Sequence, residues 1–354
     1  MQPHQKLRYL EGENKFTKVL NMAFNSIKFK LIIASVLISI TAFNQTIDIL
    51  SSGTKTSLRG LSVVDEKIIW ASGSNGMVAR SVDGGKNFIW KQVPQFEKKE
   101  FRDIEAFDSN TAIIICIAEP AYILKTIDGG KNWRTVFFDS TRGMFLDAMH
   151  FRNDKNGVVI GDPINNKPFI AITKDAGENW STDLFFEPKP MQDKEAFFAS
   201  SGTNIFLKKK QMIFVSGGNS SNLYINKNQF NLPLVQGIQS TGANSIAINK
   251  NKAIIVGGDF TKDSATHQNC VIFNLKSKQF TLPTTPPSGY RSCVVFIDKN
   301  KAITCGLNGI DMSEDAGLNW KKISNDGFHV VQKAKKGNAV FFAGSKGRIA
   351  RLIL

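Results

Sequence analysis

Cysteine, proline and charged residues are all sparse in this sequence. Its 354 residues include 4 Cys, too few for a small scaffold held together by disulfides. Charged residues make up 21% and hydrophobic residues 42%, which excludes a disordered chain. No apolar run reaches the ~20 residues of a transmembrane helix, so a polytopic membrane protein is excluded. What is present, including 28 Gly, 27 Phe and only 11 Pro, fits a globular chain, and some all-β folds of this length form one domain.

The longest apolar stretch is LIIASVLISITAF at residues 31–43, directly after Lys28 and Lys30. Two lysines before such a run are typical of a secretory signal, and at about 20 Å the run is too short to span a bilayer. We therefore expect residues 1–45 to be an N-terminal extension with a signal peptide, starting at Met1 or Met22, and the protein to be exported to the periplasm or beyond. No Cys precedes Cys116, which argues against a lipoprotein. The alternative is a buried core helix.

The chain is basic. Its formal charge is +15, and removing residues 1–45 removes six Lys/Arg and two Glu, which leaves +11. Such a surface suits acidic partners, namely anionic glycans, lipid headgroups, nucleic acid or acidic proteins, or it serves solubility alone. The densest basic run, residues 208–210, has no interleaved aromatics and is interpreted as a solvated turn. We expect no specific nucleic-acid binding and no transmembrane domain in the mature chain.

One pattern, S/T-x-D-x-G-x-N-W/F, occurs four times. It begins at Ser81, Thr126, Thr173 and Ser313, with steps of 45, 47 and 140 residues. Because 140 is close to three times 47, two degenerate copies are expected between 180 and 313. Apolar segments that end in a small residue recur in the same rhythm, and together they define seven units of about 45 residues. Self-similarity at a fixed period indicates a repeat architecture.

Each unit reads as four short strands separated by polar turns. Unit two, for example, contains FRDIEAF, AIIICIA, YILKT and WRTVFF in this order. Four strands per 40–50 residues, repeated four to eight times, predict a β-propeller. We therefore predict an all-β fold over residues 46–354: a seven-bladed propeller with four-stranded blades. The last unit has room for three strands only, so residues 46–52 are expected to supply its outer strand and close the ring.

The repeated turn has a structural logic. Its Asp can accept backbone N–H bonds, its second Gly adopts conformations that other residues avoid, and its aromatic returns to the blade core. We expect a structural rather than a catalytic role for these residues. The positions are Asp83, Gly85, Asp128, Gly130, Trp133, Asp175, Gly177, Trp180, Asp315, Gly317 and Trp320, with Phe88 as the aromatic of the first copy.

Polar residues at the starts of the inner strands, and after the second strands, are expected to meet at one mouth of the central channel. The repeated turns would lie on the opposite face. The ligand-binding candidates at this mouth are Arg59, Arg102, Asp103, Glu119, Asp147, Asp162, Asp259, Tyr290 and Arg291. Arg forks suit carboxylates and phosphates, so the set can bind an anionic or polar ligand. Alternatively, opposite charges neutralise each other and plug the channel.

Cys293 and Cys305 flank a turn centred on Lys299, so a simple hairpin places them opposite each other. Paired strands bring such residues within disulfide reach, and an exported protein permits oxidation. The alternative is that both are small buried apolar residues. No His spacing typical of a zinc site and no dinucleotide, P-loop or nucleophile-elbow motif is present, so no metal, no cofactor and no catalytic residue are assigned.

The repeated turns look like Asp boxes, also known as BNR repeats. Together with segments such as RGLSVVDEKIIWASGSNG (59–76), FRDIEAF (101–107), GDPINNKPF (161–169) and PSGYRS (287–292), they resemble the photosystem II stability/assembly factor family of seven-bladed propellers. More closely, the chain resembles a non-photosynthetic bacterial branch whose members often carry an "oxidoreductase" label. The resemblance implies the fold and a binding face, but not the photosystem partner.

Three functions follow as hypotheses. The first is an exported, non-catalytic binding or assembly propeller, expected to be monomeric, that binds a protein or an anionic ligand at the channel mouth. The second is a sialidase-like glycoside hydrolase, which needs a carboxylate or Tyr beside an Arg cluster. The third is an oxidoreductase, which only the family label supports. Whether the protein is an enzyme stays open at this point.

Overall fold

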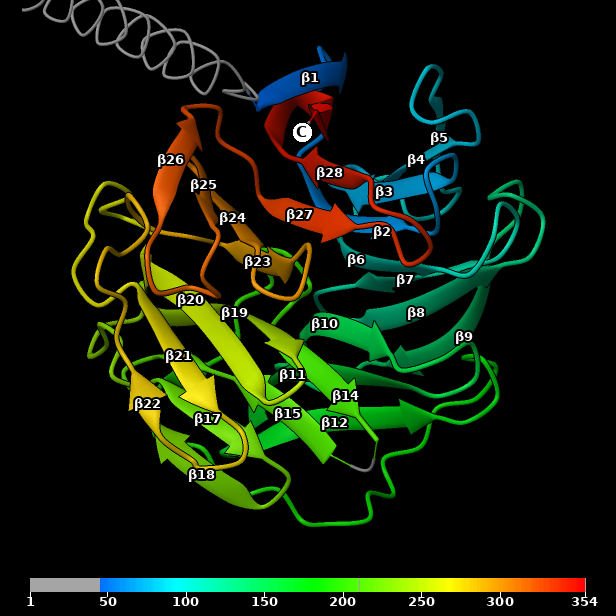
Figure 1. The fold of residues 1–354 in the computed structure, drawn as a ribbon. Helices are drawn as coiled ribbons and strands as arrows, with labels where there is room; N and C mark the ends of the chain where they lie inside the picture. Colours follow the sequence, from blue (N-terminus) through cyan, green and yellow to red (C-terminus); the bar gives the residue numbers. More distant parts are fainter. Residues whose placement is uncertain (1–44, 210, 354) are drawn as a thin grey trace, which may run out of the picture. The chain divides into compact units, whose positions relative to one another are not determined.

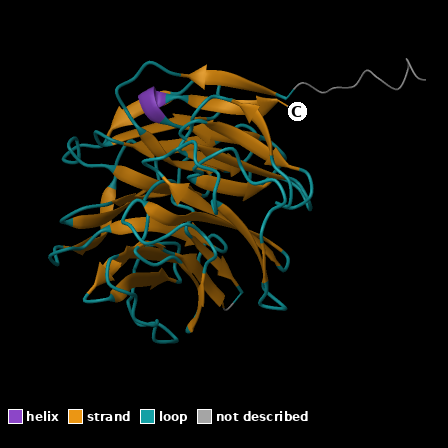
Figure 2. Ribbon diagram, turned by 90° about the vertical axis from the view of Figure 1, so that its left-hand side faces the viewer, coloured by secondary structure: helices purple, strands orange, loops and turns teal. Residues whose placement is uncertain are grey.

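The computed structural model describes residues 45–209 and 211–353. The predicted signal segment at 31–43 lies outside the described residues. Twenty-nine strands between Thr46 and Ile353 build seven sheets arranged around one axis, as Figure 1 shows. The described residues contain no α-helix, and the one 3-10 turn, η1 (Ser345–Gly347), connects β28 to β29 (Figure 2). No helix within the described ranges is long and apolar enough to cross a membrane.

The first three blades follow the predicted units. Blade one comprises β2 (Leu58–Val63), β3 (Ile69–Gly73), β4 (Met77–Ser81) and β5 (Ile89–Gln92). Blade two comprises β6 (Phe101–Ala106), β7 (Ala112–Cys116), β8 (Ala121–Thr126) and β9 (Arg134–Asp139). Blade three comprises β10 (Leu146–Phe151), β11 (Gly157–Ile164) and β12 (Lys167–Thr173). All neighbouring strands in a blade run antiparallel.

The remaining four blades complete the ring. Blade four comprises β14 (Ile205–Lys208), β15 (Gln211–Val215), β17 (Asn222–Ile225) and β18 (Asn228–Asn231). Blade five comprises β19 (Thr241–Asn249), β20 (Lys252–Asp259), β21 (Cys270–Asn274) and β22 (Phe280–Thr281). Blade six comprises β23 (Cys293–Phe296), β24 (Ala302–Gly306), β25 (Gly309–Ser313) and β26 (Lys321–Ser324). Blade seven comprises β27 (Val330–Lys333), β28 (Val340–Ala343), β29 (Ile349–Ile353) and β1 (Thr46–Ser51).

The ring closes as predicted, through the N-terminal strand. β1 pairs antiparallel with β29, Thr46 opposite Ile353 and Ile47 opposite Leu352, so the outer strand of blade seven comes from the other end of the chain (Figure 1). The main-chain ladder covers the edge that β29 would otherwise expose and makes β1 the outer strand of blade seven.

The seven-bladed, all-β fold is confirmed, with two local differences. Blade three keeps only a single bridge, Ile172 to Ser181, where a fourth strand was expected. The following segment contains Pro188 and Pro190, which have no N–H to donate to a ladder. Blade five, in contrast, gains two short strands on its inner edge, β13 (Glu195–Ala196) and β16 (Gly217–Gly218).

The core lies between neighbouring blades. The middle strands are largely buried, as in β7, where all five residues are buried, because both of their faces are covered. Outer strands such as β9 are largely exposed. The four repeated turns share one hydrogen-bond pattern: Ser81 Oγ donates to Asp83 Oδ1 (2.8 Å), and Asn87 Nδ2 donates to Asp83 Oδ2 (2.8 Å). The other copies repeat these bonds at Asp128, Asp175 and Asp315.

These turns keep their carboxylates ionised. Hydrogen bonds, first of all from the Asn of each turn, lower the pKa of Asp83, Asp128 and Asp175 to about 2. The second Gly of each copy has a positive φ, for example +86° at Gly85, which a residue with a side chain adopts only under strain. Their identity as Asp boxes of the named family stays a prediction.

Candidate functional site

The predicted channel mouth is built from strand bulges. The pairing registers of β2, β6, β10 and β19 each slip by one residue near the start of the strand, at Arg59, Arg102, Asp147 and Asn244. A bulged residue is left out of the ladder and its side chain is redirected. Burial, followed by the charge of Arg102, lowers the pKa of Arg59 to about 10.

A short segment, Ala199 to Thr203, closes this mouth, and we call it the axial plug. Arg102 Nη1 donates to Ala199 O (3.2 Å) and Arg59 Nη1 to Ser200 O (3.4 Å). On the other side of the axis, Ser201 Oγ donates to Ser292 O (2.8 Å), while Thr203 Oγ1 and Ser245 Oγ are 2.7 Å apart. Four of the five plug residues are buried. The plug thus connects the inner strands of blades one, two, five and six.

Asp103 lies directly beneath the plug and is buried. Its carboxylate accepts hydrogen bonds from the backbone N–H groups of Ile104 (2.8 Å) and Met149 (2.7 Å). Burial raises its pKa well above the usual range. Gly202, with φ +67°, packs its Cα against this carboxylate, and a Cβ at position 202 would overlap it. Asp103 is therefore part of the structural contact between plug and ring.

Two further carboxylates lie on the same side. Asp147 is fully buried, and neither carboxylate oxygen has a hydrogen-bond partner within the described residues. Burial, followed by repulsion from Asp162, raises its pKa well above the usual range, while Arg102 opposes the shift. Asp162 Oδ1 accepts the backbone N–H of Phe197 (2.9 Å), just ahead of the plug. These groups adjoin the plug.

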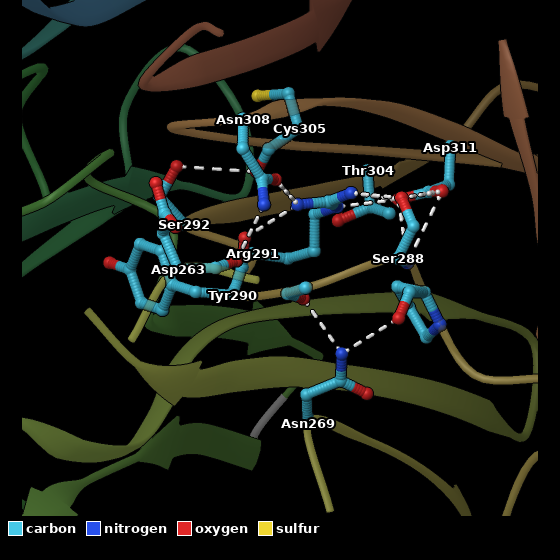
Figure 3. Close-up of polar contacts among 12 residues, drawn as sticks. Asp263, Asn269, Ser288, Tyr290, Arg291, Ser292, Thr304, Cys305, Asn308 and Asp311 are labelled. Carbon is cyan, nitrogen blue, oxygen red and sulfur yellow. Dashed lines mark hydrogen bonds and ion pairs between the residues drawn. The ribbon is translucent and has the colours of Figure 1, made fainter. Parts of the chain in front are cut away.

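Arg291 does not join Arg59 and Arg102. It is fully buried in blade six and forms an ion pair of 2.5 Å with Asp311. Its Nη2 donates to Ser288 Oγ (2.8 Å) and its Nη1 to Asn308 Oδ1 (2.7 Å), as Figure 3 shows. All the polar atoms of its guanidinium are thus satisfied by protein. The three-arginine cluster on which the sialidase hypothesis depends is not assembled.

The remaining predicted residues are held by their own surroundings. The Tyr290 hydroxyl donates to Asn244 Oδ1 (2.8 Å), and burial raises the pKa of this phenol. Asp259 Oδ1 accepts from the backbone N–H (3.0 Å) and the hydroxyl (2.7 Å) of Thr261. Glu119 is exposed and accepts the backbone N–H of Gly143. The structure thus gathers some of the predicted residues around the plug and leaves Arg291, Asp259 and Glu119 in separate local contacts.

Cys293 and Cys305 face each other on β23 and β24, as the hairpin arithmetic predicts. Both are fully buried free thiols in this structure, and the Cys293 thiol donates to Val331 O (3.3 Å). The disulfide is therefore not formed here and stays a prediction for an oxidising compartment. Among the described residues, no three His, Cys, Asp or Glu side chains gather where they could hold a metal ion.

The opposite mouth of the channel is open. A cavity of about 450 Å³ lies where the inner strands end, on the side of the turns that lead into the second strands. Asp103, Gly202 and Thr203 lie among its lining residues, so the plug gives the cavity a closed inner end. The walls combine apolar and polar groups in about equal measure. Its lining includes Phe206, Ile248, Phe296, His150, Gln332 and Lys335.

His150 on β10 is the titratable ring of this wall. Its imidazole packs on Phe206 with ring centroids 4.5 Å apart, and its Nδ1 accepts the backbone N–H of Leu207 (3.2 Å). Burial, followed by the charge of Lys335, lowers its pKa to about 4. The ring is therefore neutral near pH 7, and with Nδ1 as an acceptor its Nε2 carries the proton.

We predict that the titration of His150 lowers stability as the pH drops from about 6.5 to 4. In this window the unfolded chain binds a proton at His150 that the folded protein does not bind, so protonation favours unfolding. The His150→Asn variant retains an acceptor for Leu207 and should lose part of this pH dependence. Thermal denaturation at pH 7.5 and 5 checks the prediction, with exposed His267→Asn as the control. Equal pH dependence in all three proteins would contradict it.

Sequence reasoning placed the candidate residues at the starts of the inner strands, where the plug lies, and the cavity lies at the ends of these strands. The sequence does mark the cavity mouth at the ends of the inner strands. Most turns that follow an inner strand contain lysine, as in DKN (154–156), KKK (208–210) and DKNK (298–301). No local sequence pattern indicated that residues 199–203 fill the mouth at the starts of the inner strands.

Comparison with known proteins supports the fold alone. No family model and no curated protein matches the chain. Among solved structures, YCF48 bound to a D1 peptide superposes with a TM-score of 0.61 at 16% identity, covering 88% of this chain and 97% of that one. YCF48 from Cyanidioschyzon merolae gives 0.59 at 17% over 86% and 98%. The Pan2 WD40 domain of Neurospora crassa gives 0.57 at 14% over 84% and 89%. The chain is thus a seven-bladed propeller with a fold similar to that of YCF48.

Proposed function

We propose that this protein is a non-catalytic binding propeller that holds a segment of a partner polypeptide in the cavity at the ends of its inner strands. The observation that carries the proposal is the cavity itself: about 450 Å³, open on one face, closed on the other by the plug. This volume is in the range of ligand sites, and the walls combine apolar residues with polar groups that can orient a ligand.

The lining chemistry favours binding over turnover. Three of its titratable groups are occupied: Glu105 pairs with Lys335 (2.5 Å), Asp103 accepts two backbone N–H groups, and His150 accepts a third. No nucleophile–base pair and no free pair of carboxylates lines the cavity, which is what hydrolytic chemistry requires. The similarity to a YCF48 structure that contains a D1 peptide adds support for a polypeptide ligand.

A peptide-binding experiment tests the proposal. Peptides are selected on the purified protein from a random display library, then synthesised with a fluorophore and measured by anisotropy. Gln332 is half-buried and lines the cavity, so Gln332→Trp fills part of it and should weaken binding by about tenfold or more. Gln229→Trp, on outer strand β18, is the matched control. Failure to select any peptide, or binding that Gln332→Trp leaves unchanged, would refute the proposal.

A further inference from the structure

Eight exposed basic side chains surround one side of the cavity mouth. They belong to the turns between the first and second strands of blades three to seven, and we call them the basic arc: Arg152, Lys155, Lys209, Lys250, Lys299, Lys301, Lys335 and Lys336. Two acidic residues, Asp154 and Asp298, lie in the same turns, so these ten described residues carry a net charge of +6. The corresponding turns of blades one and two carry three acidic residues and one lysine, Lys67.

Most of the arc has no intramolecular counter-ion. Only Lys301, with Glu314 (3.2 Å), and Lys335, with Glu105 (2.5 Å), form ion pairs. Among the described residues, no carboxylate lies within ion-pair distance of the other six members of the arc. Like charges held close together repel each other, and an anionic partner relieves this repulsion.

The turns of the arc are held side by side by hydrogen bonds between blades. Arg152 Nη1 donates to Lys209 O, which joins blade three to blade four, and Lys208 Nζ donates to Lys250 O, which joins blade four to blade five. Asn249 Nδ2 then donates to Asp298 O and Lys299 O, both at 3.3 Å, joining blade five to blade six. The basic turns of blades three to six are therefore joined in one row along the rim.

We infer that the segment bound by this propeller is an acidic peptide, with carboxylates along the basic arc and one apolar side chain inside the cavity. This inference rests on the proposed function and specifies its partner. The cavity wall between Phe206, Ile248 and Phe296 receives the apolar side chain, because burying it there removes apolar area from water. The lysines carry compact, flexible charges that suit dispersed carboxylates rather than one fixed fork.

The geometry favours a peptide over a nucleic acid. The plug closes the inner end, so a strand cannot thread through the axis, and only a side chain or a chain end can enter. Single-stranded nucleic acid sites instead follow a groove with stacking platforms along it.

The test uses three fluorescent probes on the full chain: a glutamate-rich peptide ending in leucine, its glutamine counterpart, and an oligodeoxythymidylate. We expect the acidic peptide to bind at least about tenfold tighter than the glutamine peptide at low salt, with a difference that shrinks as salt screens the charges. The triple variant Lys155→Glu, Lys250→Glu, Lys299→Glu should bind the acidic peptide about tenfold or more weakly. The control variant Lys55→Glu, Lys98→Glu, Lys262→Glu changes three exposed lysines on the side that the plug closes. Its affinity for the acidic peptide should stay within about twofold of the unchanged protein.

The outcomes separate this inference from the proposed function. Equal affinity for the acidic and the glutamine peptide, or no effect of the arc variant, overturns the acidic partner. The proposed function survives that result if Gln332→Trp still weakens peptide binding. Tighter binding of the oligodeoxythymidylate than of the acidic peptide also overturns the inference, in favour of a nucleic-acid partner.

Discussion

Replacing Gly202 by valine should lower the free energy of unfolding by about 4 kcal/mol or more, since three costs combine at this position. The backbone has φ +67°, which β-branched residues strongly avoid. The added side chain overlaps the Asp103 carboxylate. Moving that carboxylate breaks its bonds to the N–H groups of Ile104 and Met149 in a buried site. Denaturant unfolding monitored by fluorescence measures the change.

Gly143→Val is the matched control for this prediction. Gly143 has φ +86°, but no atom lies within 4 Å of a Cβ placed there, so only the backbone cost of about 1 kcal/mol is expected. Similar losses in the two variants would mean that the plug does not pack on Asp103. A large loss at Gly202 alone would establish the plug as a structural member of the ring.

Arg291→Met should destabilise the propeller by about 3–5 kcal/mol, because it leaves the Asp311 carboxylate buried without its counter-ion. Arg291 and Asp311 are 0% and 1% exposed, so water cannot replace the lost guanidinium. The double variant Arg291→Met, Asp311→Leu removes both charges and should recover most of the loss. Chemical denaturation measures the free energy of unfolding of Arg291→Met, of Asp311→Leu and of the double variant.

A surface pair provides the comparison. Lys167 and Glu187 are 3.3 Å apart but 71% and 81% exposed, so Lys167→Met should cost less than about 1 kcal/mol. If Arg291→Met is as mild as Lys167→Met, the Arg291 network shown in Figure 3 is not the buried contact described here. The result bears on function too, because it tests whether Arg291 is structural.

The periodic features of the chain could be predicted from the sequence. Each unit repeats a local pattern of apolar strands and polar turns, and local patterns are legible without knowing the tertiary contacts. The count of seven blades, the closure by β1 and the facing of Cys293 and Cys305 follow from that repeat. Blade three departs from the pattern where its prolines interrupt the expected outer strand.

The sequence by itself determined the propeller, because strand period, turn chemistry and unit length depend on residues close together along the chain. Only the tertiary structure decided which mouth is open. The plug is held by contacts such as Arg59 to Ser200 and Ser201 to Ser292, which join residues 141 and 91 positions apart. Such contacts depend on where seven blades place their edges around one axis, and no local pattern records that placement. The same geometry turns a set of scattered turn lysines into the basic arc.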